Sequence, residues 1–358
     1  MHKFFALFSS VPDPRAANVR HPLSSVLFIG LAAVLCGAET CQDMADFGVS
    51  KKRLIKDIMP LPYGVPSHDV FSNVFRHLKP DAFEQVFARF ATAFGKSISG
   101  VVAIDGKAVR GAYMRGQKAT PLHLVNVWAA DARMVIGQQR APNRNEVKGV
   151  LDALACLSLE GCIVTADALH CRADTARAIL NAGADYALGL KSNQPGLLAQ
   201  AITLLEEADD PDRASTQDKK VHDRDETRHA TLVPARELDF PGVQAVASLE
   251  SIRTAKDGTQ TRHVRHFLLS KQMTAVQFMT VARTHWSIEN QLHWVLDVAF
   301  YEDASRNRKD HGPENLSILR KLALNIIRQH PEKASIRRKI KKAGWDDQFL
   351  ISMIAHMR

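Results

Sequence analysis

Three acidic side chains stand where a folded chain could gather them around metal ions. Asp105 and Asp167 each follow a short apolar run of the kind that forms a buried strand. Glu289 lies far along the chain, in a segment with helical periodicity. Carboxylates that meet in a fold repel one another and raise one another's pKa values, and a divalent cation relieves that repulsion. We therefore predict a metal site formed by these three residues.

A site of this kind suits phosphoryl transfer. Mg²⁺ prefers carboxylate oxygens and takes its remaining ligands from water and from substrate phosphates. Two ions ~3.5–4 Å apart activate an attacking oxygen and stabilise the leaving oxygen of an in-line displacement. The residue types thus indicate a two-metal, Mg²⁺-dependent reaction on a phosphodiester that needs no covalent enzyme intermediate.

The segment around Glu289 is expected to be an amphipathic α-helix. One face carries His285, Glu289 and His293 at intervals of four residues, so the carboxylate can point at a ligand. A different face is an apolar stripe made of Ile288, Leu292, Val295 and Ala299. The spacing lacks the His-Glu-x-x-His pattern of zinc enzymes, which makes zinc the weaker alternative, and the two histidines could equally line the helix surface.

The elements that must position these carboxylates indicate an α/β (α+β) domain. Between residues 100 and 193 the periodicity predicts three strands, a helix, a strand, a helix and a strand. This is the order of elements in a ribonuclease H-like domain. In that fold the first and fourth strands are neighbours, so Asp105 and Asp167, each at a strand end, would lie side by side. A lone Asp at a strand end is usually a turn residue, so the prediction depends on all three carboxylates together.

Three units are expected along the chain. Residues 1–97 are predicted to form a helical, DNA-associated domain with a basic cluster at residues 51–56. Residues 98–330 are predicted to form the catalytic domain, interrupted at about residues 198–283 by alternating runs that indicate a β-rich insertion. Residues 331–358 form a basic helical tail. A plain helical bundle and a solvated basic face are the simpler explanations of the two ends.

The charge of the chain suits a polyanionic partner. Its 358 residues carry a formal net charge of +9, with a pI near 9.4. Basic and amide side chains also follow the predicted strand and helix ends, where a phosphodiester would approach the carboxylates. The residues predicted to contact DNA in this way are Lys107, Arg110, Lys191, Asn193, Arg306 and Arg308.

Composition argues against export and against membrane insertion. The five cysteines are odd in number and form no C-x-x-C pair, which disfavours a disulfide framework and suits a reducing compartment. The apolar run at residues 26–38 has 13 residues, too few to span a bilayer, and the N-terminus has no cleavage-site pattern. We expect a soluble, cytoplasmic and nucleoid-associated protein with no membrane partner.

Several long motifs resemble one known family, in the same order along the chain. They are RHPLSSVLFIGLAAVLCG (20–37), AIDGKAVRGA (103–112), VTADALHC (164–171), ADYALGLKSNQ (184–194), RTHWSIENQLHWVLDVAFYEDASRNR (283–308) and NLSILRKLALNIIR (315–328). From about residue 20 to residue 330 the chain resembles the insertion-sequence transposases with a DDE triad, in the branch that includes the H-repeat-associated proteins.

The resemblance implies a function for the whole chain. It implies that Asp105, Asp167 and Glu289 are the catalytic triad and bind Mg²⁺ or Mn²⁺. It implies double-stranded DNA as substrate, both the terminal inverted repeats of a transposon and target DNA, with strand cleavage followed by strand transfer from a 3′-hydroxyl. Pairing two transposon ends needs at least two subunits, so we expect a homodimer on DNA.

Two details of the resemblance concern DNA contacts. A wider group of related transposases carries a Tyr-Arg-Glu-Lys signature around the glutamate, whereas this chain has Ala282, His285 and Leu296 at those places. The phosphate contacts and hairpin chemistry linked to that signature are therefore not predicted here. Residues 222–228 resemble the branch's His-Gly-Arg-x-Glu-x-Arg motif, with an aspartate in place of the glycine. Alternation puts the two arginines on one strand face as candidate DNA contacts, namely Arg224 and Arg228.

Two other functions remain open at this point. One is a catalytically silent or domesticated relative of a transposase that binds DNA without transposition. The other is a nuclease of the same fold that acts in repair or defence. Inverted repeats flanking the gene would separate an active element from a silent copy, and a preference for element ends would separate a transposase from a general nuclease.

Overall fold

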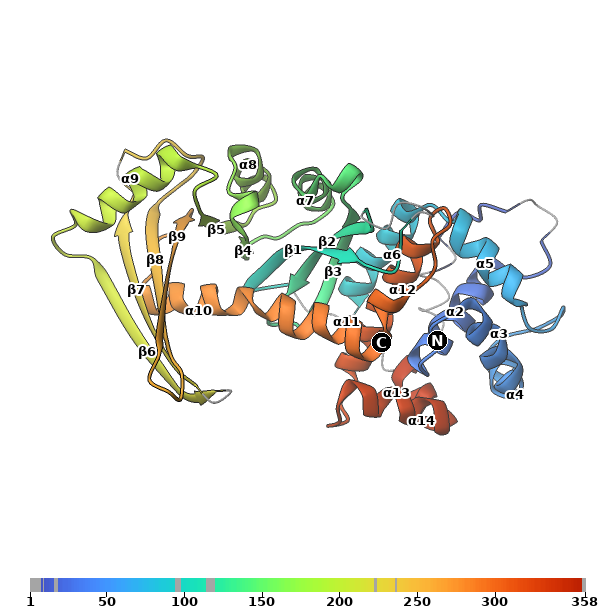
Figure 1. Cartoon of the computed structure of the whole chain (residues 1–358). Helices are drawn as coiled ribbons and strands as arrows, with labels where there is room; N and C mark the ends of the chain where they lie inside the picture. The colour runs from blue at the N-terminus through green and yellow to red at the C-terminus, as the bar shows by residue number, and fades with distance from the viewer. Residues whose placement is uncertain are drawn as a thin grey trace.

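A computed structural model describes residues 8, 10–15, 19–93, 98–113, 120–221, 224–235 and 237–355 of the chain. The fold is mixed α/β, with one nine-stranded sheet in the order β3-β2-β1-β4-β5-β9-β8-β7-β6. Figure 1 shows the sheet spanning the left and middle of the molecule, with a cluster of helices at the right. The strands are β1 (Val101–Val109), β2 (Leu122–Ala129), β3 (Met134–Arg140), β4 (Ile163–Ala166), β5 (Asp185–Leu190), β6 (Asp212–Val221), β7 (Arg224–Pro234), β8 (Ala245–Thr254) and β9 (Gln260–Leu269).

The helices fall into two groups, one covering the sheet and one at the right-hand end of Figure 1. Among the described residues, none of them is long and apolar enough to cross a membrane. The helices are α2 (Leu23–Leu35), α3 (Cys41–Ser50), α4 (Lys52–Ile58), α5 (His68–His77), α6 (Pro80–Ala93), α7 (Glu146–Ala155), α8 (Ala173–Asn181), α9 (Pro195–Glu206), α10 (Ala275–His285), α11 (Trp294–Phe300), α12 (Gly312–Gln329), α13 (Ile336–Trp345) and α14 (Asp347–Ala355). A π-helical segment, Ile288–His293, joins α10 to α11, and three short 3-10 turns lie at Pro142–Arg144, Ala168–His170 and Glu302–Ala304.

The elements from β1 to β5 follow the predicted order of strands and helices. β1 pairs antiparallel with β2 and parallel with β4, so the strand carrying Asp105 and the strand that precedes Asp167 are neighbours, as predicted. β1 does not end at Asp105, however. Its pairing with β2 continues to Val109, because β2 runs alongside it well past the point where β4 stops. Asp105 therefore projects from the middle of a strand.

Alternation along β1 divides its side chains between the two faces of the sheet. Val102 and Ile104 are fully buried in the core beneath α7 and α8. Ala103 belongs to the other core, which includes the π-helical segment and α11, and Asp105 shares its face of the strand. In Figure 1, α7 and α8 lie above the sheet, and α10 and α11 run below it. The period of two thus aims Asp105 at the helix that carries Glu289.

The residues between β5 and α10 extend the same sheet. After α9 they form four antiparallel strands, β6 to β9, and β9 pairs with β5 from Ala187 to Leu190. The lower halves of these strands continue beyond β5 and stand apart at the left of Figure 1. Strand β9 is thus fixed to the central sheet at one end, and its residues 263–267 line a cavity together with the carboxylates.

The helices at the two ends of the chain share one core. α2 is almost entirely apolar and buried, and it packs against α3, α5, α12, α13 and α14. In the basic tail, the Lys339 ammonium is buried and donates to the carbonyl oxygens of Ile327 and His330, 2.9 and 2.8 Å away. The tail therefore packs onto the N-terminal helices, and at least one of its cations serves the fold. The division into units at residues 97 and 330 stays a prediction.

One side chain of helix α12 hydrogen-bonds to the backbone of β3 at the free edge of the sheet. The Asn325 Oδ1 accepts from the backbone N–H of Val135 at 2.9 Å, and its Nδ2 donates to the Val135 carbonyl at 2.8 Å. Both residues are fully buried. Because β3 is an edge strand, its outward backbone groups have no strand partner, and this amide replaces one.

Removing this amide should cost stability without altering chemistry. We expect Asn325→Ala to lower the free energy of unfolding by about 2–4 kcal/mol, because two buried backbone groups lose their partners. Urea denaturation followed by circular dichroism would measure the change. Asn181→Ala, at the exposed end of α8, is the matched control and should stay within about 0.5 kcal/mol of the wild type. An equal effect of the two substitutions would contradict the role given to Asn325.

Candidate active site

Asp105 is a partly buried carboxylate on β1, with 19% of its side chain exposed. Burial raises the pKa of Asp105 to about 8, and the carboxylates of Glu289 and Asp167 add to the rise. A carboxyl in this position either keeps its proton near neutral pH or needs a cation beside it. The predicted repulsion among the three acidic residues is therefore strongest at Asp105.

Glu289 lies in a π-helix where the sequence predicts an α-helix. The backbone N–H of Trp294 bonds to the Glu289 carbonyl, five residues earlier, so the turn is wider than an α-helical one. A period of 3.6 residues cannot reveal this local expansion, because the apolar residues Ile288 and Leu292 still face the core. The Glu289 side chain is 52% exposed and opens on a cavity that Asp105 also lines.

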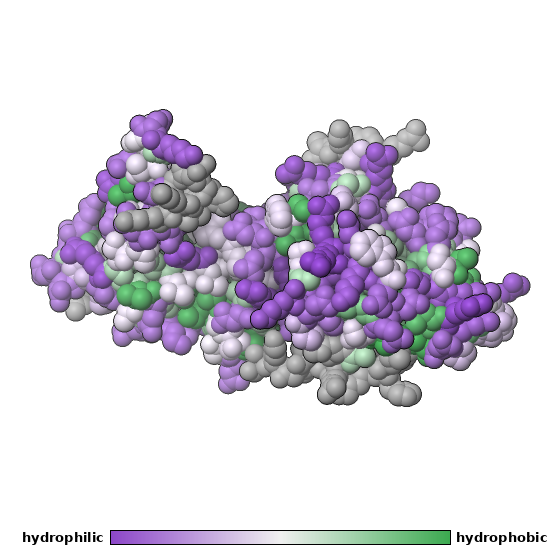
Figure 2. Space-filling view, turned by 90° about the horizontal axis from the view of Figure 1, so that it is seen from below, coloured by the Kyte–Doolittle hydropathy of each residue, from purple (hydrophilic) through white to green (hydrophobic). Residues whose placement is uncertain are grey.

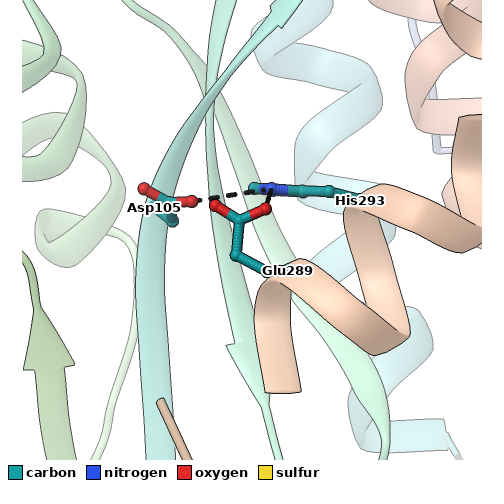
Figure 3. A group of neighbouring side chains, drawn as sticks. All are labelled: Asp105, Glu289 and His293. Atoms are coloured by element: carbon teal, nitrogen blue, oxygen red, sulfur yellow. Dashed lines mark ion pairs between the residues drawn. The ribbon is translucent and has the colours of Figure 1, made fainter. Parts of the chain in front are cut away.

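His293 completes a compact group with these two carboxylates (Figure 3). Its Nδ1 lies 3.5 Å from the Asp105 Oδ2 and 3.6 Å from the Glu289 Oε2. One ligand atom from each of the three residues lies within 4.8 Å of the others, which fits a divalent cation. The imidazole beside Glu289 lowers the pKa of that carboxyl.

Asp167 also lines this cavity and lies directly after β4. Its Oδ1 accepts from the backbone N–H of Leu169 at 3.1 Å, so it also caps the short turn Ala168–His170. It is not a member of the group that Asp105 and Glu289 form with the histidine. The structure thus brings Asp105 and Glu289 close together, and Asp167 lines the same cavity.

A second polar cluster, which the sequence alone does not reveal, lies next to Asp167. The Glu146 carboxylate, at the start of α7, lies 2.6 Å from the His123 Nε2 and 3.7 Å from the His170 Nε2. The same His170 nitrogen is 3.8 Å from the Asp167 Oδ1. The two imidazoles lower the pKa of Glu146 to about 2. No local pattern marks this cluster, because its members come from β2, α7 and the turn after β4.

The Glu146 side chain lies so close to the β1 backbone that it leaves room only for a glycine after Asp105. A Cβ at Gly106 would lie 2.5 Å from the Glu146 Oε2. Any larger residue would push that carboxylate away from the histidines. Glu146 is therefore in contact with the neighbours of both strand-borne carboxylates, Asp105 on one side and Asp167 on the other.

Basic residues also line the cavity and form its basic wall. Its volume is about 580 Å³, and β8 and β9 contribute Arg253, His263 and Arg265 to its lining. The Arg265 guanidinium lies 5.0 Å from the centroid of the Trp286 ring. Lys191, a predicted DNA contact, lines the same cavity. Figure 2, seen from below, shows a broad hollow between two projecting parts of the molecule.

Lys107 does not occupy the position expected for a DNA contact. It is 8% exposed, and its ammonium lies 2.7 Å from Asp297 and 3.2 Å from Asp303. Alternation turns this lysine toward α11, so its charge is neutralised inside the protein. Arg110 remains exposed at the end of β1, with its Nε 3.4 Å from Asp303.

Three other predicted contacts have partners within the protein. The Asn193 Nδ2 donates to the carbonyl of Ala168 at 2.7 Å and so braces the turn after Asp167. Arg228 is paired with Asp218 and, at 2.6 Å, with Glu226. Arg308 donates to the carbonyl of Gly111 at 2.9 Å and stacks on the Tyr113 ring.

The last two predicted arginines, Arg306 and Arg224, lie in different parts of the fold. Arg306 is exposed and lines a separate groove of about 450 Å³ beside α5. Arg224 begins β7, and its side chain lies outside the described residues. Arg253 and Arg265 are the basic residues that the sequence prediction missed. The one indication of them in the sequence is that both lie within the segment predicted to be a β-rich insertion.

Comparison with known proteins gives two matches to families and several relatives. Residues 96–326 match the family described as "Transposase DDE domain", and residues 5–91 match one described as "DDE_Tnp_1-associated". Two proteins of Escherichia coli (strain K12), "Putative protein YbfL" and "H repeat-associated putative transposase YhhI", are each 32% identical to the chain over 372 residues, with 99% of this chain and 98% of the relative covered. "Inactive transposase YbfQ" of the same strain is 35% identical over 75 residues, which are 21% of this chain and 89% of the relative.

Neutralising Asp105 should stabilise the metal-free protein. A carboxyl whose folded pKa is raised costs stability above its unfolded pKa of about 4, and the cost grows until the pH reaches about 8. We expect the free energy of unfolding of metal-free Asp105→Asn to exceed that of the wild type by at least about 1 kcal/mol at pH 8, with a smaller difference at pH 5. Thermal melting in EDTA at the two pH values would measure it.

Added Mg²⁺ should raise the melting temperature of the wild type more than that of Asp105→Asn, because an ion that binds only the folded state stabilises it. Asp210→Asn, in the exposed bend between α9 and β6, is the control and should match the wild type at both pH values. A metal-free Asp105→Asn protein that melts below the wild type at pH 8 would contradict the electrostatic account of this site.

Proposed function

Because the chain belongs to the family of transposases with a DDE domain, we propose that Asp105, Asp167 and Glu289 are its catalytic triad and that it cleaves and joins DNA strands at transposon ends. The observation that supports this proposal is the shared cavity. All three carboxylates line it, and so do the residues of the basic wall. An anionic centre facing fixed cations suits a phosphodiester that bridges the two through metal ions.

The residues of the cavity have distinct parts in the reaction. Divalent ions, Mg²⁺ or Mn²⁺, would be held by the three carboxylates and supply Lewis acidity to both oxygens of an in-line displacement. Lys191 and Arg265 bind the phosphates of the strand, whereas Arg253 is paired with Glu226 at 3.2 Å. Cleavage exposes a 3′-hydroxyl, and the same residues orient it for attack on target DNA. The ribonuclease H-like fold is part of this proposal, supported by the pairing of β1 with β4.

The substrate that this proposal requires is double-stranded DNA with the terminal inverted repeats of a transposon, together with target DNA. A homodimer on DNA would hold two ends at once. The N-terminal helices α2 to α6 and the exposed arginines Arg110, Arg306 and Arg308 supply further contacts along the duplex. A catalytically silent relative that only binds DNA is the second candidate, and the cleavage assay below separates the two.

The triad is tested by cleavage of a labelled duplex that carries the element's own terminus, in Mg²⁺. We expect Asp105→Ala and Glu289→Ala each to lower the cleavage rate at least about a hundredfold, because metal assistance supplies several kcal/mol of transition-state stabilisation. DNA binding by gel shift should persist in both. Asp210→Asn is again the control and should cleave at the wild-type rate.

The outcomes of this assay separate the candidates. Cleavage at the terminus by the wild type and the control alone supports the transposase. Full cleavage by Asp105→Ala would overturn the triad assignment. Binding without cleavage by any of the proteins, the wild type included, would favour the silent relative.

The basic wall is tested by the salt dependence of DNA binding. We expect Arg265→Ala to weaken binding and to reduce the slope of log K against log salt by about 1, the value for one lost phosphate contact. Arg262→Ala is the matched control on the same strand, because that guanidinium is paired with Glu250 and lies outside the cavity. Fluorescence anisotropy across a salt series would measure both variants. Equal slopes for Arg265→Ala and the wild type would remove Arg265 from the DNA-binding surface.

A further inference from the structure

His293 points a ring nitrogen at the two carboxylates that lie closest together. We propose that His293 is a protein ligand of the ion held by Asp105 and Glu289, so that this position takes a nitrogen donor and favours Mn²⁺ over Mg²⁺. The inference rests on the proposed function, because it concerns one of the ions used by the same site. It adds a residue and a metal preference that the three carboxylates do not imply.

The first argument is distance. The contacts from the His293 Nδ1 to Asp105 and Glu289, 3.5 and 3.6 Å, exceed the usual hydrogen-bond range of about 2.7–3.2 Å. Neighbouring ligand atoms around one octahedral ion lie about 3 Å apart, as bonds of about 2.1 Å at right angles require. A contraction of about half an ångström in these two contacts would therefore bring the His293 Nδ1 to the spacing of neighbouring ligands around a single ion. Figure 3 shows the three side chains converging on one point from β1 and the π-helix.

The second argument is burial. His293 is 6% exposed, so its ring has little freedom to turn away from the cavity. It occupies the last position of the π-helix that also carries Glu289. One short segment thus fixes two donors relative to each other, while the strand supplies the third. Local expansions of this type are frequent at functional sites.

The third argument is the partner of the other ring nitrogen. The His293 Nε2 lies 3.2 Å from the side-chain amide of Asn126, a fully buried residue that pairs with Asp105 across β1 and β2. Among the residues that the structure describes, none hydrogen-bonds to the Oδ1 of the same amide. A half-turn of the amide places this oxygen against Nε2–H and leaves the Nδ1 lone pair for the ion. Metal-binding histidines commonly donate their second nitrogen to an oxygen in this way.

The ligand set explains the metal preference. Mg²⁺ and Mn²⁺ both favour oxygen donors, but Mn²⁺, as a transition-metal ion, accepts an imidazole nitrogen more readily than Mg²⁺ does. The other histidine near Glu289 is engaged elsewhere, because the His285 Nδ1 lies 3.0 Å from the Thr165 Oγ1. His285 therefore provides a matched control within the same cavity.

The test is pulsed electron paramagnetic resonance of Mn²⁺ bound to the full-length protein without DNA. A directly coordinated imidazole gives ¹⁴N modulation of the electron spin echo. We expect this modulation in the wild type and in His285→Gln, and its loss in His293→Gln. We also expect His293→Gln to bind Mn²⁺ about tenfold more weakly while its affinity for Mg²⁺ changes less. Wild-type protein with ¹⁵N-labelled histidine should show the shifted nitrogen frequencies, a reading that does not depend on how a variant folds.

The outcomes separate this inference from the proposed function. Mn²⁺ binding that Asp105→Ala abolishes, with no nitrogen modulation in the wild type, would overturn the role of His293 and leave the carboxylate site intact. Modulation that persists in His293→Gln would overturn it as well. A wild-type protein that binds no Mn²⁺ at millimolar concentration would overturn both this inference and the metal-dependent function.

Discussion

Electrostatic repulsion among three carboxylates is the constraint on which the rest of this structure depends. Asp105 is partly buried, and Glu289 and Asp167 line the same cavity, so the pKa of Asp105 is raised to about 8. A fold that pays this cost without a function would be under pressure to lose it. The surrounding groups, His293 beside the first pair and His170 beside Asp167, are arranged to hold the charges in place.

The fold holds these charges through contacts between distant parts of the chain. Parallel pairing of β1 with β4 sets the spacing of the two aspartates. The π-helix delivers Glu289 to the same face of the sheet, and α12 anchors the edge strand through Asn325. The terminal helices pack around α2 in one core with α11 and α12. Rigidity near the carboxylates is thus supplied by helices from both ends of the chain.

The added strands determine which cations face the carboxylates. Because β9 joins the sheet beside β5, it contributes Arg265 to the lining of the cavity that also holds the carboxylates. Lys107, only two residues from Asp105 in sequence, is instead neutralised by Asp297 and Asp303. Proximity along the chain is therefore a poor guide to which basic residues meet a phosphodiester. Lys107 projects from the same strand face as Asp105, so the acidic partners that a side chain meets in the fold decide it.

The sequence by itself determined the elements that depend on local pattern. It predicted the order of strands and helices from β1 to β5, the place of Asp167 after β4, and the helical segment with an apolar face around Ile288 and Leu292. Only the tertiary structure decided the π-helical turn at Glu289, the burial of Lys107 and the meeting of His293 with Asn126. Hydrophobic periodicity reports which face of an element is buried, and it operates over a few residues. The partner of a buried polar group is set by elements far away in sequence, so no local pattern encodes it.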